Sequence, residues 1–351
     1  MKETIELLSR LIATPSVSGK EQDTAGILSQ YLASKTDVSV STMGNNVIAI
    51  KEPFLKNRPA VLLCSHHDTV APSAGYSRDP YTPMLETDTE GRVRLYGLGS
   101  NDAGASLVAM TEAFLRTENV PYNLILVLAA EEEISGKNGI ASVLPHIPYI
   151  SCALVGEPTG MRAAIAERGL LVLDGVAKGE AAHAALGGGV NALYKALEDI
   201  ALLKNYRFLK HSSIMGAVHL QVTQIQAGTQ HNVIPDTCRF VVDIRTTDVY
   251  TNTEIMEEIE SVLPGRLIPR NMTHKASATP CDHPLIKAVE TANIPTYVSP
   301  TTSDWMRMTC PALKIGPGCS TRSHAPDEYV YLDEIAQGIS IYKNLITMLT
   351  P

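Results

Sequence analysis

Three short apolar segments constrain the fold of this chain more than any other feature. Residues 60–64, 123–130 and 152–155 consist almost entirely of Ala, Val, Leu, Ile and Cys. A strand that is apolar at nearly every position has both faces covered, which is typical of the central strands of a parallel sheet. Apolar residues at helical spacing, as in 3–13 and 103–115, predict the helices that cover those faces. We therefore expect an α/β protein with a mostly parallel central sheet.

The pattern changes between Arg168 and Met272. There the spacing predicts, in order, a strand, a helix, two strands and a helix, at 170–177, 190–203, 218–226, 237–245 and 253–263. Consecutive strands between helices indicate an inserted α+β unit. After Lys275 the α/β pattern returns. We expect a main domain at 1–166 and 273–351, interrupted by an inserted domain at 167–272.

Composition excludes several classes of protein. The 351 residues carry a net charge of -8, which argues against a nucleic-acid-binding surface. No pair of the six cysteines has C-x-x-C spacing, so we expect free thiols in a reducing compartment. The first residues do not form a signal peptide, and no apolar run approaches the roughly 20 residues of a membrane span. We expect a cytoplasmic protein that does not associate with membranes.

Each of the three apolar segments is followed by metal-binding side chains. His66 and Asp68 follow the first segment, Glu131 to Glu133 follow the second, and Glu157 follows the third. A glycine-rich turn carries Asp102, and His324 lies near the C-terminus. Taken singly, a histidine at a strand end is more often a hydrogen-bonded cap, and a run of glutamates is usually a solvated face. Several carboxylates beside an apolar sheet repel one another unless a cation compensates them, so the combination predicts a metal site.

The types of side chain narrow the choice of metal. Imidazoles and carboxylates without thiolates suit Zn²⁺, Co²⁺ or Mn²⁺. Two histidines and three carboxylates are too many for one four-coordinate zinc, and they fit two ions about 3.5–4 Å apart that share a carboxylate. A further carboxylate that binds no metal would then be the general base.

A nucleotide site is the weaker interpretation of residues 97–106. This segment has a G-x-G start, but Asp102 replaces the third glycine of the dinucleotide fingerprint. No Walker lysine follows, and G-x-S-x-G is absent from the chain.

Five motifs carry a resemblance to a known family. They are S-H-H-D-T-V (65–70), G-S-N-D-A-G (99–104), E-E-E-I-S-G (131–136), G-E-P-T (156–159) and S-H-A-P-D-E (323–328). Their order resembles that of the di-zinc metallohydrolases, which include acetylornithine deacetylase, succinyl-diaminopimelate desuccinylase, aminoacylase and glutamate carboxypeptidase. The resemblance implies a zinc-hydrolase catalytic domain with an inserted ferredoxin-like lid, through which two copies form a homodimer.

The resemblance also implies a role for each residue of the site. The metal ligands would be His66, Asp102, Glu133, Glu157 and His324, with Asp102 bridging two Zn²⁺ ions and with His66 and Glu157 on opposite ions. Asp68 would orient the His66 imidazole. Glu132 would be the base that takes a proton from a metal-bridging water, although three consecutive glutamates leave the register between Glu131 and Glu132 open.

In the insertion, the resemblance points to three residues. His183 matches a family histidine that stabilises the oxygen of the tetrahedral intermediate, often from the partner subunit, and its ordinary interpretation is a packed or exposed histidine. Asn232 and Arg245 match substrate-binding positions, but Arg245 is also placed to pair with Asp243 on its own strand. In the main domain, Gly316 and Gly318 would offer backbone N–H groups to a substrate carboxylate.

The function implied is removal of an acetyl or succinyl group from an N-acyl amino acid. Acetylornithine deacetylase activity, and with it a role in arginine biosynthesis, is the first choice because the chain length and the wording of two motifs resemble that branch. Desuccinylase, acetylcitrulline deacetylase and small-dipeptidase activities stay open, as does a non-catalytic relative that binds a metal or an amino acid.

Overall fold

The computed structural model describes residues 1–350, which form two compact units. Unit 1 comprises Met1–Ile165, Thr279–Tyr297 and the chain from Ser303 onward, and unit 2 comprises Ala166–Ala278 and Val298–Thr302. The short segment Val298–Thr302 belongs to unit 2, although it lies far outside the expected insertion.

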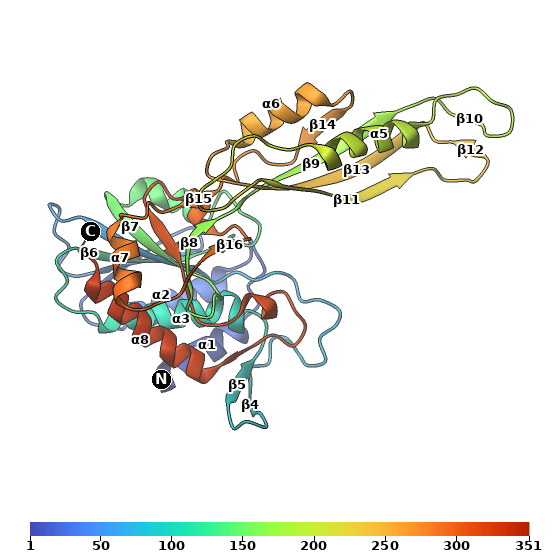
Figure 1. Ribbon diagram of the computed structural model, residues 1–351. Helices are drawn as coiled ribbons and strands as arrows, with labels where there is room; N and C mark the ends of the chain where they lie inside the picture. The colour runs from blue at the N-terminus through green and yellow to red at the C-terminus, as the bar shows by residue number, and fades with distance from the viewer. Residues whose placement is uncertain (351) are drawn as a thin grey trace. The chain divides into compact units, whose positions relative to one another are not determined.

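Most strands of unit 1 belong to a nine-stranded sheet with the order β1-β2-β6-β3-β7-β17-β8-β15, in which β16 also pairs with β8 (Figure 1). In its centre β3 runs parallel to β6 and β7, and β17 runs parallel to β7. The pairs at both edges are antiparallel. The expected α/β fold with a parallel centre is confirmed. The strands are β1 (Val38–Met43), β2 (Asn46–Lys51), β3 (Ala60–His66), β6 (Asn123–Ala129), β7 (Ile150–Gly156), β8 (Ala163–Glu167), β15 (Ser277–Ala278), β16 (Thr296–Ser299) and β17 (Ala312–Lys314).

Apolar side chains cover both faces of this sheet, as the fully apolar strands predict. Leu63 of β3 packs in one core with residues of the long helices, whereas its neighbours Leu62 and Cys64 pack in a second core with Ile140 and Trp305. Alternate residues of a strand point to opposite faces, so one strand contributes to both cores. The helices of unit 1 are α1 (Lys2–Ile12), α2 (Gln22–Ala33), α3 (Ala105–Arg116), α4 (Ile140–Val143), α7 (Pro284–Thr291) and α8 (Leu332–Met348), with short helical turns at η1 (Ser100–Gly104), η2 (Leu144–His146), η3 (Asp304–Arg307) and η4 (Ser320–Arg322).

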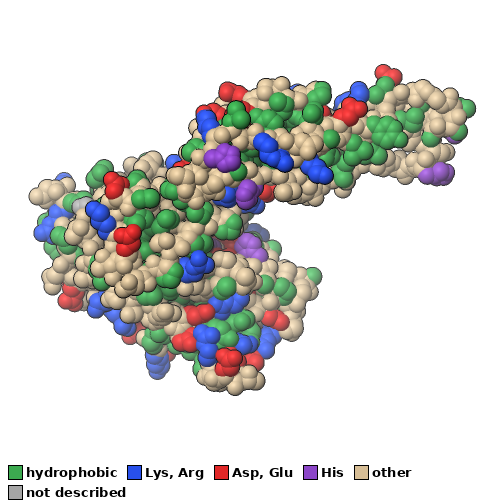
Figure 2. Space-filling view, in the orientation of Figure 1, with side chains coloured by type: hydrophobic (Ala, Val, Ile, Leu, Met, Phe, Trp, Pro, Cys, Tyr) green, Lys and Arg blue, Asp and Glu red, His purple; other side chains and the backbone are tan. Residues whose placement is uncertain are grey.

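A small three-stranded sheet with the order β18-β5-β4 lies beside the segments that carry Asp102 and His324. Its strands are β4 (Met84–Thr87), β5 (Val93–Tyr96) and β18 (Tyr329–Tyr331). The sequence did not predict β4, because all its side chains are exposed and show no apolar alternation. Arginines stack on the tyrosines of this sheet, with Arg92 3.5 Å from the ring centre of Tyr331. Figure 2 shows arginine or lysine side chains interspersed with acidic ones over this part of unit 1.

Unit 2 contains a four-stranded antiparallel sheet with the order β11-β13-β9-β14. Helices α5 and α6 both pack on one core with it, and the chain order β-α-β-β-α-β matches the ferredoxin-like fold that we expected. The fourth strand, β14, was not predicted because it is short and lies at the sheet edge. The elements are β9 (Gly169–Lys178), α5 (Ala192–Asn205), β11 (His219–Ala227), β13 (Thr237–Thr246), α6 (Asn252–Val262) and β14 (Arg266–Pro269), with β10 (Ala182–His183) and β12 (Val233–Ile234) as a separate pair.

Two expectations drawn from composition can be compared with this structure. All six cysteines are free, which confirms the prediction of thiols without disulfides. Among residues 1–350, no helix has both the length and the apolar character needed to cross a membrane.

Candidate metal centre

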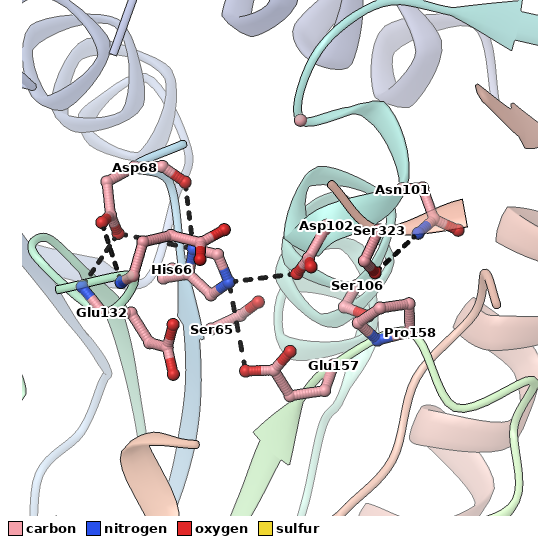
Figure 3. A network of polar contacts seen from close by, with 12 residues as sticks. Ser65, His66, Asp68, Asn101, Asp102, Ser106, Glu132, Glu157, Pro158 and Ser323 are labelled. Carbon is pink, nitrogen blue, oxygen red and sulfur yellow. Dashed lines mark hydrogen bonds and ion pairs between the residues drawn. The ribbon is translucent and has the colours of Figure 1, made fainter. Parts of the chain in front are cut away.

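His66 ends β3 and lies at the centre of a cluster of carboxylates (Figure 3). Its side chain is almost fully buried, because it continues a strand whose residues are all buried. Its Nδ1 atom lies 3.1 Å from the backbone oxygen of Asp68 and 3.4 Å from Asp68 Oδ1. On the other side of the ring, Nε2 lies 3.4 Å from Asp102 Oδ1 and 4.0 Å from Glu157 Oε1, and it forms no hydrogen bond. The imidazole therefore presents a buried nitrogen without a hydrogen-bond partner to two carboxylates.

Asp102 lies between the two histidines of the cluster. Its Oδ1 atom faces His66, and its Oδ2 atom lies 3.6 Å from His324 Nε2. The residue belongs to η1, a turn in which Asp102 has the extended angles φ -116° and ψ 101°. The helix that we expected from residue 103 begins only at Ala105, after this turn. One carboxylate thus presents a different oxygen to each imidazole, as a bridging ligand must.

The three consecutive glutamates after β6 have different surroundings. Glu131 adopts a positive φ of 55°, and its carboxylate accepts hydrogen bonds from the backbone N–H and the side chain of Asn138. Glu132 and Glu133 can each join His66 in a group of possible metal ligands, and Glu133 Oε2 lies 2.9 Å from His324 Nε2. The geometry therefore favours Glu132 over Glu131 as the candidate base.

The distances between donor atoms favour a pairing of the ligands that differs from the one implied by the resemblance. The resemblance placed His66 and Glu157 on opposite ions, but these side chains lie next to each other, and Glu133 instead lies beside His324. Glu157, the residue directly after β7, reaches the His66 imidazole because β3 and β7 pair in parallel up to Ser65 and Gly156. The shortest distances would pair His66 with Asp102 and Glu157 at one ion, and His324 with Asp102 and Glu133 at the other.

Crowding of partly buried carboxylates changes their proton affinities. Burial, followed by the charge of Glu157, raises the pKa of Glu132 well above its usual value. Burial also raises the pKa of Glu157 to about 8, although the nearby His66 opposes this. Burial alone would lower the pKa of His66, but the neighbouring Asp102 and Asp68 carboxylates raise it well above the usual value. The hydrogen bond to Glu133 raises the pKa of His324 to about 9. Without a cation, the cluster compensates its negative charge by holding protons.

Asp68 connects the ends of two strands. Its carboxylate accepts hydrogen bonds from Ser18 Oγ at 2.7 Å and from the backbone N–H groups of Glu132 and Glu133, each at 3.1 Å. Burial opposes ionisation here, but the hydrogen bond and charge of His66, together with these donors, lower the pKa of Asp68 to about 2. Asp68 therefore stays ionised and sets the position of both the imidazole and the glutamate loop.

These residues fit metal ions. The donors are imidazole nitrogens and carboxylate oxygens, and two groups of three, His66–Asp102–Glu133 and His66–Glu132–Glu157, have donor atoms that all lie within 4.8 Å of one another. Two donors at about 2.0–2.1 Å from a tetrahedral zinc are about 3.4 Å apart, which matches the 3.4 Å between His66 Nε2 and Asp102 Oδ1. The unpartnered, buried Nε2 atom is the strongest sign, because a nitrogen in that position loses its hydration without a replacement.

Sequence reasoning missed two buried glutamates that hold the backbone of this site. Glu21 accepts hydrogen bonds from the Asn45 side chain at 2.8 Å and from the Glu131 N–H at 3.3 Å. Glu328 is only 2% exposed, and its carboxylate accepts the N–H groups of Gly99, Asn101 and Asp102. A single glutamate far along the chain carries no local signal of such a contact. For Glu328, its place in the motif that contains His324 was the only clue.

Three of the candidate residues, His183, Asn232 and Arg245, belong to unit 2. His183 is exposed, and its β10 strand pairs with β12, so that the Ala184 N–H donates to the Asn232 carbonyl at 3.0 Å. The segments that carry His183 and Asn232 therefore lie side by side. Arg245 makes a two-bond ion pair with Asp243 at 2.8 Å and 3.1 Å, which is the ordinary alternative considered for it.

The two glycines of unit 1 differ in what they offer. The Gly316 N–H already donates to Thr159 Oγ1 at 3.0 Å, so it is not available to a substrate in this arrangement. Gly318 has a φ of 93°, and a Cβ atom there would lie 2.6 Å from Asn101 Oδ1. The structure therefore explains Gly318 by close packing against the Asp102 turn.

Comparison with known proteins agrees with this geometry. Residues 62–348 match the model of peptidase family M20/M25/M40. The chain belongs to this family. It is 27% identical over 366 aligned residues to acetylornithine deacetylase from Salmonella paratyphi B, covering 93% of this chain and 92% of that protein, and it matches the enzyme from Salmonella newport equally well.

Solved structures of family members share the fold across the whole chain. A tripeptidase from Staphylococcus aureus superposes with a TM-score of 0.79 at 16% identity, covering 99% of this chain and 97% of that one. A metallo-carboxypeptidase from Sulfolobus solfataricus gives a TM-score of 0.78 at 16% identity and covers 99% of both chains. A dinuclear metal-binding peptidase from Bacillus subtilis gives 0.73 at 14% identity, covering 99% of this chain and 97% of that one. The chain is thus an M20-family metallohydrolase.

Proposed function

We propose that this protein is a metal-dependent amidohydrolase that removes an acetyl or succinyl group from an N-acyl amino acid. The observation that carries the proposal is the buried, unpartnered Nε2 atom of His66 facing Asp102 and Glu157. Acetylornithine is the first candidate substrate, because proteins named acetylornithine deacetylase match almost the entire chain. The proposal extends to a cytoplasmic role in arginine biosynthesis.

Two Zn²⁺ ions per chain are the proposed cofactor, and Co²⁺ or Mn²⁺ would substitute. His66 and Glu157 would hold one ion, His324 and Glu133 the other, and Asp102 would contribute one oxygen to each. When bound, such ions lower the pKa of water to near neutrality and polarise a carbonyl group.

Glu132 is the proposed general base. Its half-buried carboxylate lies close to Glu157, and desolvation followed by the charge of Glu157 raises its pKa above that of a free glutamate, as suits a general base. It would take one proton from the attacking water as the water oxygen bonds to the amide carbon. When the C–N bond breaks, Glu132 would return that proton to the leaving amine, which yields a free amino acid and a carboxylate. Asp68 would keep the His66 ring and the Glu132 backbone in place during these steps.

Unit 2 is proposed to contribute substrate contacts and a dimer interface. His183 would stabilise the negative charge that develops on the carbonyl oxygen. Asn232 and Arg245 would bind the substrate, with Arg245 exchanging Asp243 for a substrate carboxylate. Gly316 and Gly318 were expected to donate N–H groups to a substrate carboxylate. Because the Gly316 N–H already donates to Thr159 Oγ1, the proposal does not include this role for Gly316.

The proposed homodimer uses the edge of the unit 2 sheet. Strand β11 lies at that edge with most of its residues exposed, and an unpaired edge can pair with a second chain. On α5, Tyr194 and Leu197 are 64% and 47% exposed, and Figure 2 shows apolar side chains along this part of unit 2. Replacing Leu197 with Asp should convert the dimer to a monomer in sedimentation measurements, and an unchanged mass would exclude this surface.

The function is tested with a panel of substrates. N-acetylornithine, N-acetylcitrulline, N-succinylornithine, N-succinyl-diaminopimelate and a dipeptide are incubated with the protein, with added Zn²⁺ or Co²⁺ and with a chelator. Chelator-sensitive release of product from one N-acyl amino acid supports the proposal and names the substrate. Turnover of the dipeptide alone would instead indicate a peptidase, which is what the similar structure from Staphylococcus aureus is named. Metal uptake without any turnover would favour a non-catalytic relative.

A further inference from the structure

Glu328 stands out because its buried carboxylate is bound almost entirely by backbone N–H groups. Its Oε1 atom accepts from Asn101 at 2.8 Å and from Asp102 at 2.9 Å, and its Oε2 atom accepts from Gly99 at 3.1 Å. Both carboxylate oxygens therefore accept hydrogen bonds from the same turn. A carboxyl group that accepts three N–H groups at once restrains the backbone that carries them, so this contact is suited to fix a backbone conformation.

The turn that Glu328 binds is not stabilised by a regular pattern of backbone hydrogen bonds. Gly99 has a positive φ of 75°, and Asp102 and Ala103 depart from helical angles, so the N–H groups between β5 and α3 lack a continuous ladder. Buried N–H groups need acceptors, and three of them meet in one carboxylate. The conformation of the turn decides where the Asp102 side chain points.

A second set of contacts ties the same turn to the segment that carries His324. The Asn101 side chain accepts from the Cys319 N–H at 2.8 Å, and it donates to the Cys319 carbonyl at 3.1 Å and to Ser323 Oγ at 3.3 Å. Glu328 follows His324 by only four residues. The Asp102 turn and the His324 segment are thus cross-linked on both sides of His324.

We propose that Glu328 is a positioning residue, which sets the orientation of Asp102 between His66 and His324 before any metal binds. By fixing the N–H groups of residues 99–102, it directs Oδ1 of Asp102 to one imidazole and Oδ2 to the other. Glu328 touches neither substrate nor metal in this role, and it acts through Asp102 alone. The inference rests on the metal centre proposed above.

The neighbouring residue provides a matched control. Asp327 likewise accepts backbone N–H groups, from Ser77 at 2.9 Å and Arg78 at 3.3 Å, and it also accepts from Ser77 Oγ. The loop at 77–78 contributes no donor to the metal centre. Asp327→Asn therefore removes a similar carboxylate from the same segment without altering the Asp102 turn.

The test compares Co²⁺ binding by the full chain, by Glu328→Gln and by Asp327→Asn, each first stripped of metal. The amide of glutamine keeps one acceptor but turns a donor toward the turn, so Glu328→Gln should bind Co²⁺ about 10- to 100-fold more weakly. Its visible Co²⁺ absorption spectrum should also change, because the bridging carboxylate is displaced, whereas Asp327→Asn should keep both the affinity and the spectrum. Native affinity and an unaltered spectrum in Glu328→Gln would refute the positioning role and leave the metal centre intact.

Hydrogen exchange on the unaltered, metal-free chain tests the same idea without a variant that must fold. The peptide spanning residues 98–104 should exchange slowly before metal is added, since Glu328 already holds its amides. Exchange at the rate of an exposed loop, with protection appearing only when Co²⁺ binds, would overturn the proposal. Failure of the native chain to bind Co²⁺ at all would overturn the metal centre, and the positioning role with it.

Discussion

Asp68→Asn should destabilise the metal-free protein, and the structure gives the size of the effect. The Asp68 carboxylate, beside His66, accepts from Ser18 and from the N–H groups of Glu132 and Glu133. These contacts outweigh burial and lower its pKa to about 2. An aspartate with that folded pKa and an unfolded pKa of about 4 contributes about 2–3 kcal/mol at neutral pH. Asparagine loses the charge and presents an NH₂ group to backbone donors, so we expect a loss of about that size.

The sign of the pH dependence follows from the lowered pKa. The stabilisation is fully present above the unfolded pKa, near pH 4, and is lost as the pH falls through the folded pKa, near pH 2. The difference between the native chain and Asp68→Asn should therefore be constant from pH 7 to pH 5 and shrink as the pH falls below 4.

Urea unfolding at several pH values, with a chelator present, measures this difference. Asp333→Asn is the matched control, because Asp333 makes a two-bond ion pair with Arg92 on the surface. Exposed pairs contribute about 0–1 kcal/mol, so the control should lose little stability. A loss for Asp68→Asn no larger than that of the control, or a loss that does not diminish below pH 4, would refute the reasoning.

Two further predictions concern the glycine turn and unit 2. Gly318→Ala should lower the free energy of unfolding by about 1–3 kcal/mol, because residue 318 has a positive φ and a Cβ atom there would collide with Asn101. Gly91→Ala is the control, because Gly91 also has a positive φ but open space around it, so this variant should lose less stability. Equal losses in thermal or urea unfolding would contradict the packing argument. His183→Ala should reduce kcat by about 10²–10³-fold with unchanged metal content, since its proposed partner is the developing oxygen charge. The exposed His211 serves as the control for that kinetic assay, and native turnover in His183→Ala would remove His183 from the mechanism.

Much of unit 1 could be predicted because its central strands are apolar over their whole length. The strands β3, β6 and β7 all lie where apolar runs placed them. By contrast, β8 is rich in alanine and β4 is exposed, so neither carries the hydrophobic pattern on which prediction depends. Elements that exist mainly through pairing with distant strands leave little trace in the local sequence.

The candidate site, too, could be predicted from the sequence only in part. The donors could be found because they follow buried strands or lie in recognisable motifs, but their pairing could not. His66 lies beside Glu157 because β3 and β7 are neighbours in the sheet, which is a property of topology. The register of the three glutamates depends on the positive φ at Glu131, which the sequence does not specify. Glu328 was missed as a support because its three partners lie more than 220 residues earlier in the chain.

Glu132→Gln tests the central claim most directly, when metal content and turnover are measured on the same sample. The change keeps the size of the side chain and removes the proton acceptor, while the ligands His66, Asp102, Glu133, Glu157 and His324 are untouched. The account predicts two bound ions per chain and a turnover of the identified substrate that falls by several orders of magnitude. Turnover close to that of the native chain, with both ions bound, would contradict the assignment of Glu132 as the base.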